Sequence, residues 1–166
     1  MAEDAFTAEE IRELRQLLEI EKIRKVKNLY SHLMDSRQLE AMMELYTEDA
    51  IGEWGPSGTC HGRAEILASL KKSYEGRPPY AGLHFTTNMW VELTGPTTAI
   101  ARTYLHDVIT GVHDPRTNPV IWFAIYDEDF RKVGSDWQIS RSRIQFLWPS
   151  WHAYEDFPRP MTAAAA

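Results

Sequence analysis

Apolar residues recur at helical spacing over the first third of the chain. From Ile11 onward they lie mostly three or four positions apart, as on one face of a helix. Thr7 followed by Glu10 is a capping-box pattern, which predicts that the helix starts there. Neither Gly nor Pro interrupts residues 1–51, so the pattern predicts either one long helix or two helices with a bend near Glu19.

Two shorter helices are predicted next along the chain. Residues 37–47 carry their apolar side chains on one side of a helix, and a short helix is also expected over residues 63–74, after Gly62. The glycine-rich stretch 52–58 predicts a loop between these two helices.

The second half of the chain changes to strand-like sequence. Its segments are rich in Thr, Val, Ile and aromatic residues, and turn residues bound each of them: 83–93, 98–110, 119–130 and 136–148. Helices followed by a run of adjacent strands favour an α+β fold with a mostly antiparallel sheet.

Alternation along these strands puts aromatic and polar side chains on the same faces. A purely solvated face would carry more Lys and Glu and fewer Trp and Tyr, whereas mixed faces are typical of a concave ligand pocket. The residues on such faces are His84, Asn88, Trp90, Tyr104, His106, Trp122, Arg141 and Arg143. Trp54, from the loop before these strands, is a further candidate for an aromatic lining.

Composition and charge limit the number of domains and the kinds of partner to be expected. The 166 residues, 43% apolar and 25% charged, suffice for one packed domain, which we expect to span residues 1–160. Residues 161–166 are expected to be a disordered tail or a cloning remnant. The net charge of −6 comes without a dense basic stripe, which argues against nucleic acid and membrane surfaces as partners.

Other features exclude further kinds of site. The lone cysteine, Cys60, rules out an intrachain disulfide framework and a multi-cysteine zinc site. No two histidines have metal-binding spacing, and no nucleotide-binding fingerprint occurs. No apolar run approaches the length of a membrane helix, and the acidic N-terminus differs from a signal peptide. We therefore expect a cytoplasmic protein that needs neither a metal nor an organic cofactor.

Five short motifs follow one another in an order found in a known superfamily. They are Tyr30–Asp35, Tyr46–Ala50, His61–Ile66, His84–Asn88 and Trp137–Arg141. In these motifs the chain resembles the nuclear transport factor 2-like (NTF2-like) superfamily, in the SnoaL-like branch of scytalone dehydratase and related lyases. The resemblance implies a cone-shaped, strongly curved sheet, mostly antiparallel, that packs against the N-terminal helices and encloses one apolar cavity.

The same resemblance implies a catalytic base. In the lyase branch an Asp near the end of the first helix pairs with a His at the start of a central strand, and the matching residues here are Asp35 and His84. A carboxylate that holds one imidazole nitrogen as a donor leaves the other nitrogen free to accept a proton. Tyr30, Tyr104 or His106 would then polarise an oxygen of the substrate.

The function implied is that of a cofactor-independent lyase acting on an aromatic or polycyclic small molecule. After proton abstraction the substrate would lose water, a halide or a carbon fragment such as formaldehyde. Asn88 and either Arg141 or Arg143 would orient the substrate, and tryptophans would line the cavity: Trp54, Trp90 and Trp122.

Other interpretations stay open at this point. A ketosteroid-isomerase-like proton shuttle would use a pocket carboxylate without a histidine partner. A non-catalytic subunit would bury His84 in packed core and have no cavity. From the residues alone, Asp35 is better explained as an exposed carboxylate in the last turn of the first helix or as the cap of the next helix.

The end of the last predicted strand suggests self-association. The segment Phe146–Trp151 holds three large aromatic side chains, and exposed apolar patches usually mark interfaces. Because relatives in the lyase branch associate as trimers, the resemblance implies a homo-oligomer, with a trimer expected before a dimer.

Overall fold

The computed structural model describes residues 6–110, 119–149, 151–157 and 159–160, so the predicted tail at 161–166 lies outside the described residues. The helices of the described part are α1 (Ala8–Asp35), α2 (Leu39–Met42) and α3 (Gly62–Ser73). Its strands are β1 (Tyr46–Glu53), β2 (Thr59–His61), β3 (Gly82–Leu93), β4 (Thr98–Ile109), β5 (Val120–Val133) and β6 (Asp136–Trp148). Short 3₁₀ turns at Met43–Leu45 and Gly55–Ser57 lie before and after β1.

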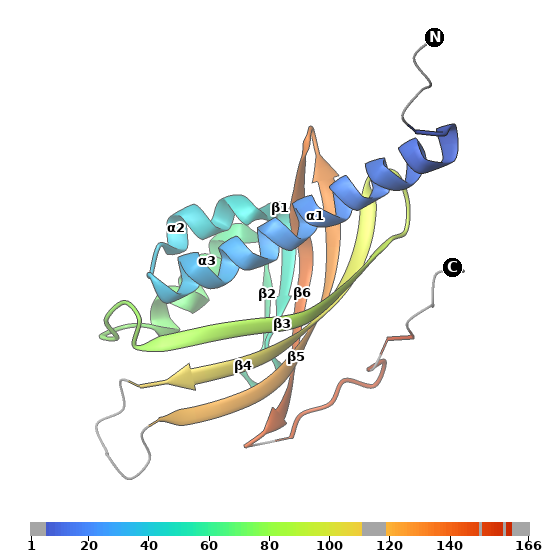
Figure 1. Cartoon of the computed structure of the whole chain (residues 1–166). Helices are drawn as coiled ribbons and strands as arrows, with labels where there is room; N and C mark the ends of the chain where they lie inside the picture. The colour runs from blue at the N-terminus through green and yellow to red at the C-terminus, as the bar shows by residue number, and fades with distance from the viewer. Residues whose placement is uncertain (1–5, 111–118, 150, 158, 161–166) are drawn as a thin grey trace.

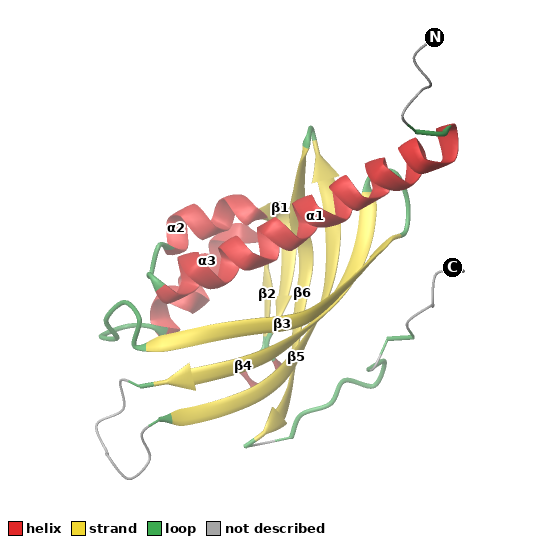
Figure 2. Cartoon of the chain, viewed as in Figure 1, coloured by secondary structure: helices red, strands yellow, loops and turns green. Residues whose placement is uncertain are grey.

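The strands form one curved sheet in the order β2-β1-β6-β5-β4-β3 (Figure 1). β1 runs parallel to β6, and every other neighbouring pair is antiparallel. The helices cover one face of this sheet (Figure 2). The predicted α+β fold with a mostly antiparallel sheet is confirmed, but the sheet does not close, since β2 and β3 remain its edges.

Helix α1 is a single continuous helix without a bend at Glu19. The Thr7 side chain accepts from the backbone of Glu10, and the Glu10 carboxylate accepts from the backbone of Thr7, which is the predicted capping box. The N-terminal half of α1 extends past the sheet, and only its second half buries side chains, from Ile23 to Asp35. Among the described helices, none is both long and apolar enough to cross a membrane.

Two strands were not predicted from the sequence. The predicted helix over 37–47 ends at Leu45, and β1 begins at the next residue. β1 contains few β-branched residues, so it depends on pairing with β6, which lies about ninety residues later in the chain. β2 is only three residues long and carries no detectable period.

Two irregularities in the ladder change which residues share a face. In β3, Thr87 pairs with Tyr104 but Trp90 pairs with Arg102, so one extra residue is inserted near Asn88. Asn88 takes up this insertion with a positive φ of 53°. His84 and Trp90, which strict alternation would put on one face, therefore lie on opposite faces of the sheet.

Replacing Asn88 by Val should reduce the free energy of unfolding by about 1–2 kcal/mol, because a β-branched residue is strained at positive φ. Asn88→Gly removes the same side chain without that strain and serves as the control. Urea unfolding of both variants measures the difference. Equal stability of the Val and Gly variants would contradict the assignment of a strained bulge.

A buried ion pair lies between α1 and the sheet face that the helices cover. Lys27 of α1 and Glu128 of β5 approach to 2.9 Å between Nζ and Oε1, and both side chains are almost fully buried. The Lys27 ammonium also lies 3.3 Å from the ring centroid of Tyr126 and 4.4 Å from that of Tyr30. This pair fixes the middle of α1 against β5, and with it the position of Tyr30.

Candidate active site

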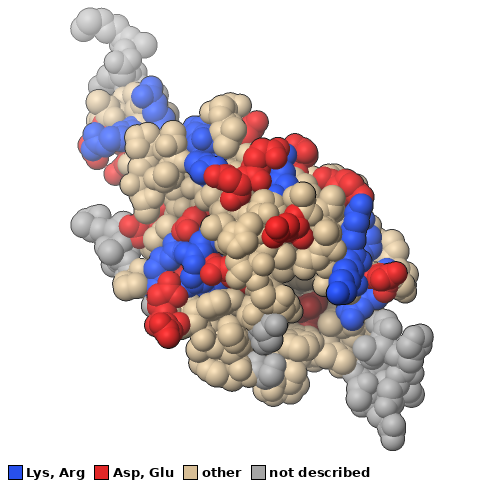
Figure 3. All heavy atoms as spheres, turned by 180° about the vertical axis from the view of Figure 1, so that it is seen from behind, with Lys and Arg blue, Asp and Glu red and all other residues tan. Residues whose placement is uncertain are grey.

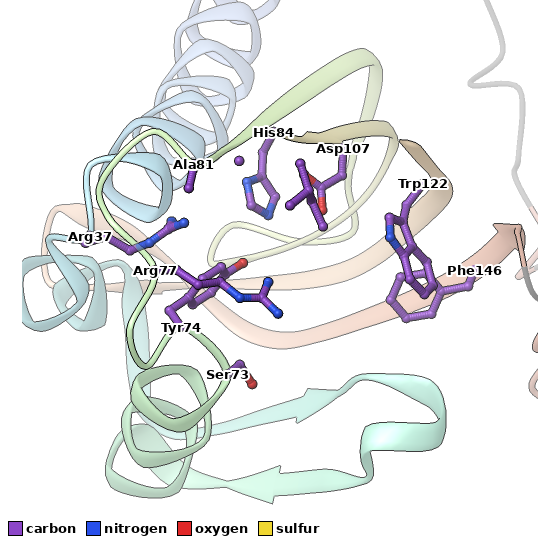
Figure 4. Close-up of a pocket in the computed structure, with 11 residues that line it drawn as sticks. Arg37, Ser73, Tyr74, Arg77, Ala81, His84, Asp107, Trp122 and Phe146 are labelled. Carbon is purple, nitrogen blue, oxygen red and sulfur yellow. The ribbon is translucent and has the colours of Figure 1, made fainter. Parts of the chain in front are cut away.

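The candidate site is an open pocket between the end of α1, the end of α3 and the sheet (Figure 4). It consists of two adjoining hollows of about 370 Å³ and 170 Å³, a size suited to a small molecule. Both hollows are lined by Ser73, Tyr74, His84, Asp107 and Phe146. The pocket is open, so the expected closed cavity is wrong, whereas its lining is mainly apolar with a few charged side chains among it.

Asp35 lies behind His84, which lines both hollows, and the two side chains are in direct contact. Asp35 Oδ1 lies 2.6 Å from His84 Nδ1, and the backbone N–H of His84 donates to both carboxylate oxygens at 3.2 Å and 3.1 Å. Both side chains are largely buried, at 11% and 6% exposure. Because Asp35 is the last residue of α1 and His84 is near the start of β3, the packing of α1 across β3 brings them together.

This arrangement determines which imidazole nitrogen carries the proton. An ionised carboxylate only accepts hydrogen bonds, so Nδ1 must be the donor to Asp35. No described residue hydrogen-bonds the other nitrogen, Nε2, and the ring projects into the pocket (Figure 4). Nε2 is therefore a free acceptor that faces the space where a ligand would bind.

Asp107 is a pocket residue that the sequence analysis missed. It pairs with His84 across β3 and β4, so the two side chains lie on the same face. Its Oδ1 is buried without a hydrogen-bond partner in the described structure. Burial raises the pKa of this carboxyl; the His84 side chain opposes the shift, and the charge of Asp35 adds to it.

Tyrosines form the deeper wall of the pocket. The hydroxyls of Tyr30 and Tyr126 are 3.3 Å apart, and both residues line the smaller hollow. Burial raises the pKa of each well above its ordinary value. Burial also raises the pKa of Tyr74 to about 12. All three hydroxyls are thus protonated at neutral pH and can act as hydrogen-bond donors.

Aromatic side chains complete the walls. Trp122 and Phe146 pack edge to face, with ring centroids 5.2 Å apart, and both line the larger hollow. Trp54, which follows β1, lines the smaller hollow. The predicted pocket positions of Trp54, Trp122 and Tyr30 agree with the structure, whereas Phe146, expected at an exposed interface, turns into the pocket.

His106 and Tyr104 do not line the pocket. They alternate with Asp107 and Leu105 along β4 and therefore face the opposite, outer side of the sheet. The ring of His106 stacks there against Phe123, with centroids 4.7 Å apart. The placement of His106 and Tyr104 beside the substrate is corrected accordingly.

The other predicted orienting residues also lie on the outer side. Asn88 and Trp90 line an outer hollow together with Tyr104, because the bulge in β3 reverses the alternation. A second irregularity, where Asp129 pairs with Arg141 and Phe130 with Ile139, does the same in β6. Arg141 and Arg143 consequently turn outward.

These two arginines are engaged in ion pairs. Arg141 and Arg143 both contact Glu53, at 2.5 Å and 3.2 Å, and Arg143 also contacts Asp156 at 2.6 Å. The expectation that one of them faces the pocket is therefore wrong, because both guanidinium groups bind carboxylates on the outer side.

Two arginines that the sequence analysis did not select line the pocket instead. Arg37 follows α1 with a positive φ of 62°, and Arg77 follows α3. Figure 4 shows both guanidinium groups directed into the pocket. Residues in such connecting segments have no periodicity, so no pattern in the sequence could have assigned them to a face.

The described residues contain no cluster of three or more His, Cys, Asp or Glu side chains arranged to hold a metal ion. The polar groups at the pocket are one imidazole, two carboxyls, three phenols and two guanidinium groups. They belong to His84, Asp35, Asp107, Tyr30, Tyr74, Tyr126, Arg37 and Arg77. Such a set can abstract a proton, donate hydrogen bonds and attract an anion.

Comparison with known proteins identifies the family of the chain and structures with a similar fold. A family model for the SnoaL-like domain matches residues 15–143. No curated protein matches the chain. An NTF2-like protein with a cystatin-like fold from Novosphingobium aromaticivorans is 24% identical with a TM-score of 0.71, covering 89% of this chain and 94% of its own.

Two further solved structures are named for an activity. A protein provisionally assigned as a scytalone dehydratase from Novosphingobium aromaticivorans DSM 12444 is 20% identical, with a TM-score of 0.70 and coverage of 80% of this chain and 86% of its own. A provisionally assigned dehydratase of the NTF2-like family from Streptomyces avermitilis is 15% identical, with a TM-score of 0.67 and coverage of 78% and 96%. At these identities the likeness concerns the fold alone.

Proposed function

The chain belongs to the SnoaL-like domain family, and on this premise we propose that it is a cofactor-independent lyase acting on an aromatic or polycyclic small molecule. The observation that carries the proposal is the buried Asp35–His84 pair, with a free imidazole nitrogen facing an aromatic-lined pocket. In this reaction His84 removes a proton from carbon, and a group leaves from the neighbouring carbon.

Four side chains at the pocket have a role in this reaction. Nε2 of His84 takes the proton, and the Asp35 carboxylate stabilises the resulting imidazolium. The electron pair of the broken C–H bond forms the new double bond, while the leaving group departs with the electrons of its own bond. Burial raises the pKa of Asp107, and in its protonated form this carboxyl donates a proton to a departing hydroxide. The Tyr30 hydroxyl polarises a substrate oxygen.

A panel of simple probes tests the proposal. A cyclic aromatic β-hydroxy ketone, the matching β-chloro ketone and an α-hydroxymethyl ketone would be incubated with the protein in deuterated buffer. Release of water, chloride or formaldehyde above the buffer rate, lost in His84→Ala, supports a lyase. Absence of both elimination and His84-dependent deuterium uptake across the panel would count against it.

One observation favours a second candidate, a proton shuttle of the ketosteroid-isomerase kind. Asp107 is a pocket carboxyl that makes no hydrogen bond to the histidine, as such a mechanism requires. The two candidates differ in which substitution abolishes deuterium uptake by the cyclic ketone. His84→Ala abolishes uptake if the lyase base is His84, whereas Asp107→Asn abolishes it if Asp107 is the base.

The state of Asp107 has a consequence for stability that melting curves can check. Its raised pKa means that the folded protein resists ionising this carboxyl, so stability falls as pH rises from the ordinary Asp range through the raised value. Asp107→Asn lacks this loss, and its Tm relative to wild type should increase between about pH 4 and pH 7. Asp136→Asn, at an exposed position, is the control; a difference for Asp107→Asn that does not change with pH would contradict the assignment.

The outer face of the sheet supports the proposal of a homo-oligomer. Phe85, Phe123 and Trp148 are 43% to 52% exposed there, and Trp151 is 68% exposed. Figure 3, the view from behind, shows a broad area without charged side chains, with Lys, Arg, Asp and Glu gathered at its margins. Light scattering should give a multiple of the 19.2 kDa protomer mass, three being expected first; the protomer mass at micromolar concentration would refute it.

A further inference from the structure

Two arginines of the pocket lack an ionic partner. In the described part of the chain, neither Arg37 nor Arg77 forms an ion pair, although both line the hollow that contains His84. Other arginines lie against acidic side chains: Arg63, Arg131, Arg141, Arg143 and Arg159. Arg37 and Arg77 thus present guanidinium charge to the pocket that no acidic side chain of the described residues pairs with.

Two contacts fix the position of the Arg37 side chain, but some of its N–H groups have no acceptor. Its Nη1 donates to the carbonyl oxygen of Met34 at 2.6 Å, and its guanidinium lies 4.0 Å from the ring centroid of Tyr74. Its Nε is buried without an acceptor in the described structure. A buried N–H group without an acceptor is unfavourable, and a ligand oxygen would relieve that cost.

Arg77 supplies the second positive charge. It follows α3, is exposed to solvent, and its guanidinium extends past Tyr74 into the pocket (Figure 4). No described residue accepts a hydrogen bond from this side chain. It is therefore available to a ligand at the mouth of the pocket.

The carboxyls of the pocket do not neutralise these arginines. The oxygens of Asp35 already accept hydrogen bonds from the ring and the backbone of His84. Asp107 forms no ion pair with either arginine in the described structure, and burial raises the pKa of its carboxyl, which opposes its ionisation. The mouth of the pocket consequently has an excess of positive charge.

We propose that Arg37 and Arg77 bind a carboxylate group of the ligand, so that the pocket takes an aromatic acid. The guanidinium group matches a carboxylate in charge and geometry, and two of them at one site favour an anionic ligand over its neutral analogue. Trp122 and Phe146, on the sheet side of the same hollow, pack against the ring. That this ligand is a substrate rests on the proposed lyase function, whereas the preference for an anion does not.

Calorimetric titration with trans-cinnamate and trans-cinnamamide tests the proposal, because the two probes share a shape and differ in charge. Wild-type protein should bind cinnamate at least about tenfold more tightly than the amide, as expected for a charge-assisted hydrogen bond. In Arg77→Met the difference should fall to about threefold or less. Lys72→Met removes the same charge from the exposed end of α3, outside the pocket lining, and should keep the wild-type difference.

The outcomes separate this inference from the proposed function. Equal binding of the two probes, no binding of either, or an Arg77→Met variant with the wild-type preference would overturn the carboxylate site. Loss of the preference in Lys72→Met as well would also overturn it, because the effect would then reflect overall charge. Neither probe has a group to eliminate, so the result is independent of whether His84 acts as a base.

Discussion

His84→Ala is expected to lower kcat by about 100-fold or more on a turned-over substrate, because removing a general base typically costs 10²–10⁴-fold. Asp35→Asn should produce a loss of similar size. The Nδ1 proton would no longer be held by a charged acceptor at 2.6 Å, and the imidazolium would lose its stabilising charge. Turnover of the best probe from the ketone panel, for wild type and both variants, is the measurement.

The double variant distinguishes a catalytic pair from two separate contributions. If Asp35 acts through His84, the double variant loses far less than the product of the two single losses. Thermal melting controls for folding, which should be retained because neither side chain contributes apolar area to the core. Near-wild-type turnover in His84→Ala would end the assignment of the base, and loss of folding rather than turnover would favour a structural role for both.

Glu128→Gln should be the most destabilising conservative change in the core, with a loss of about 3–5 kcal/mol in the free energy of unfolding. The change leaves the Lys27 ammonium fully buried and without its counter-charge, while keeping nearly the same volume. The Ser142 hydroxyl, which donates to the same carboxylate oxygen at 3.0 Å, does not replace the missing charge.

The pH dependence and a matched variant identify the cause. Burial lowers the pKa of Lys27, so folded Glu128→Gln should shed the Lys27 proton more readily than the unfolded chain, and its stability should rise with pH. Replacing both partners, Lys27→Met with Glu128→Leu, should restore much of the lost stability. Urea unfolding at several pH values measures both effects; a Glu128→Gln variant within about 1 kcal/mol of wild type would contradict them.

The sequence was informative where structure depends on neighbouring residues. The helical spacing and the capping box predicted α1, and the composition of the second half predicted β3 to β6. β1 escaped prediction because its stability comes from pairing with β6, far along the chain. Local propensity contains no information about such a partner.

The residues of the candidate site were likewise predicted correctly in part. Asp35 and His84 were identified from motifs, and their contact follows from the packing of α1 across β3. On β4, the chemistry of His106 and Tyr104 favoured one face, but the pairing of His84 with Asp107 makes the other face line the pocket. The faces of a strand differ by a single residue of register, which the sequence does not specify.

Nitrogen NMR of the His84 ring tests the central claim most directly. With ¹⁵N-labelled histidine, and His84→Gln to assign the signal, the protonation of each ring nitrogen can be observed without any substrate. We predict that the neutral ring carries its proton on Nδ1 and leaves Nε2 unprotonated, because the Asp35 carboxylate accepts from Nδ1. A neutral ring with its proton on Nε2 would contradict the account, since the nitrogen that faces the pocket could not then act as a base.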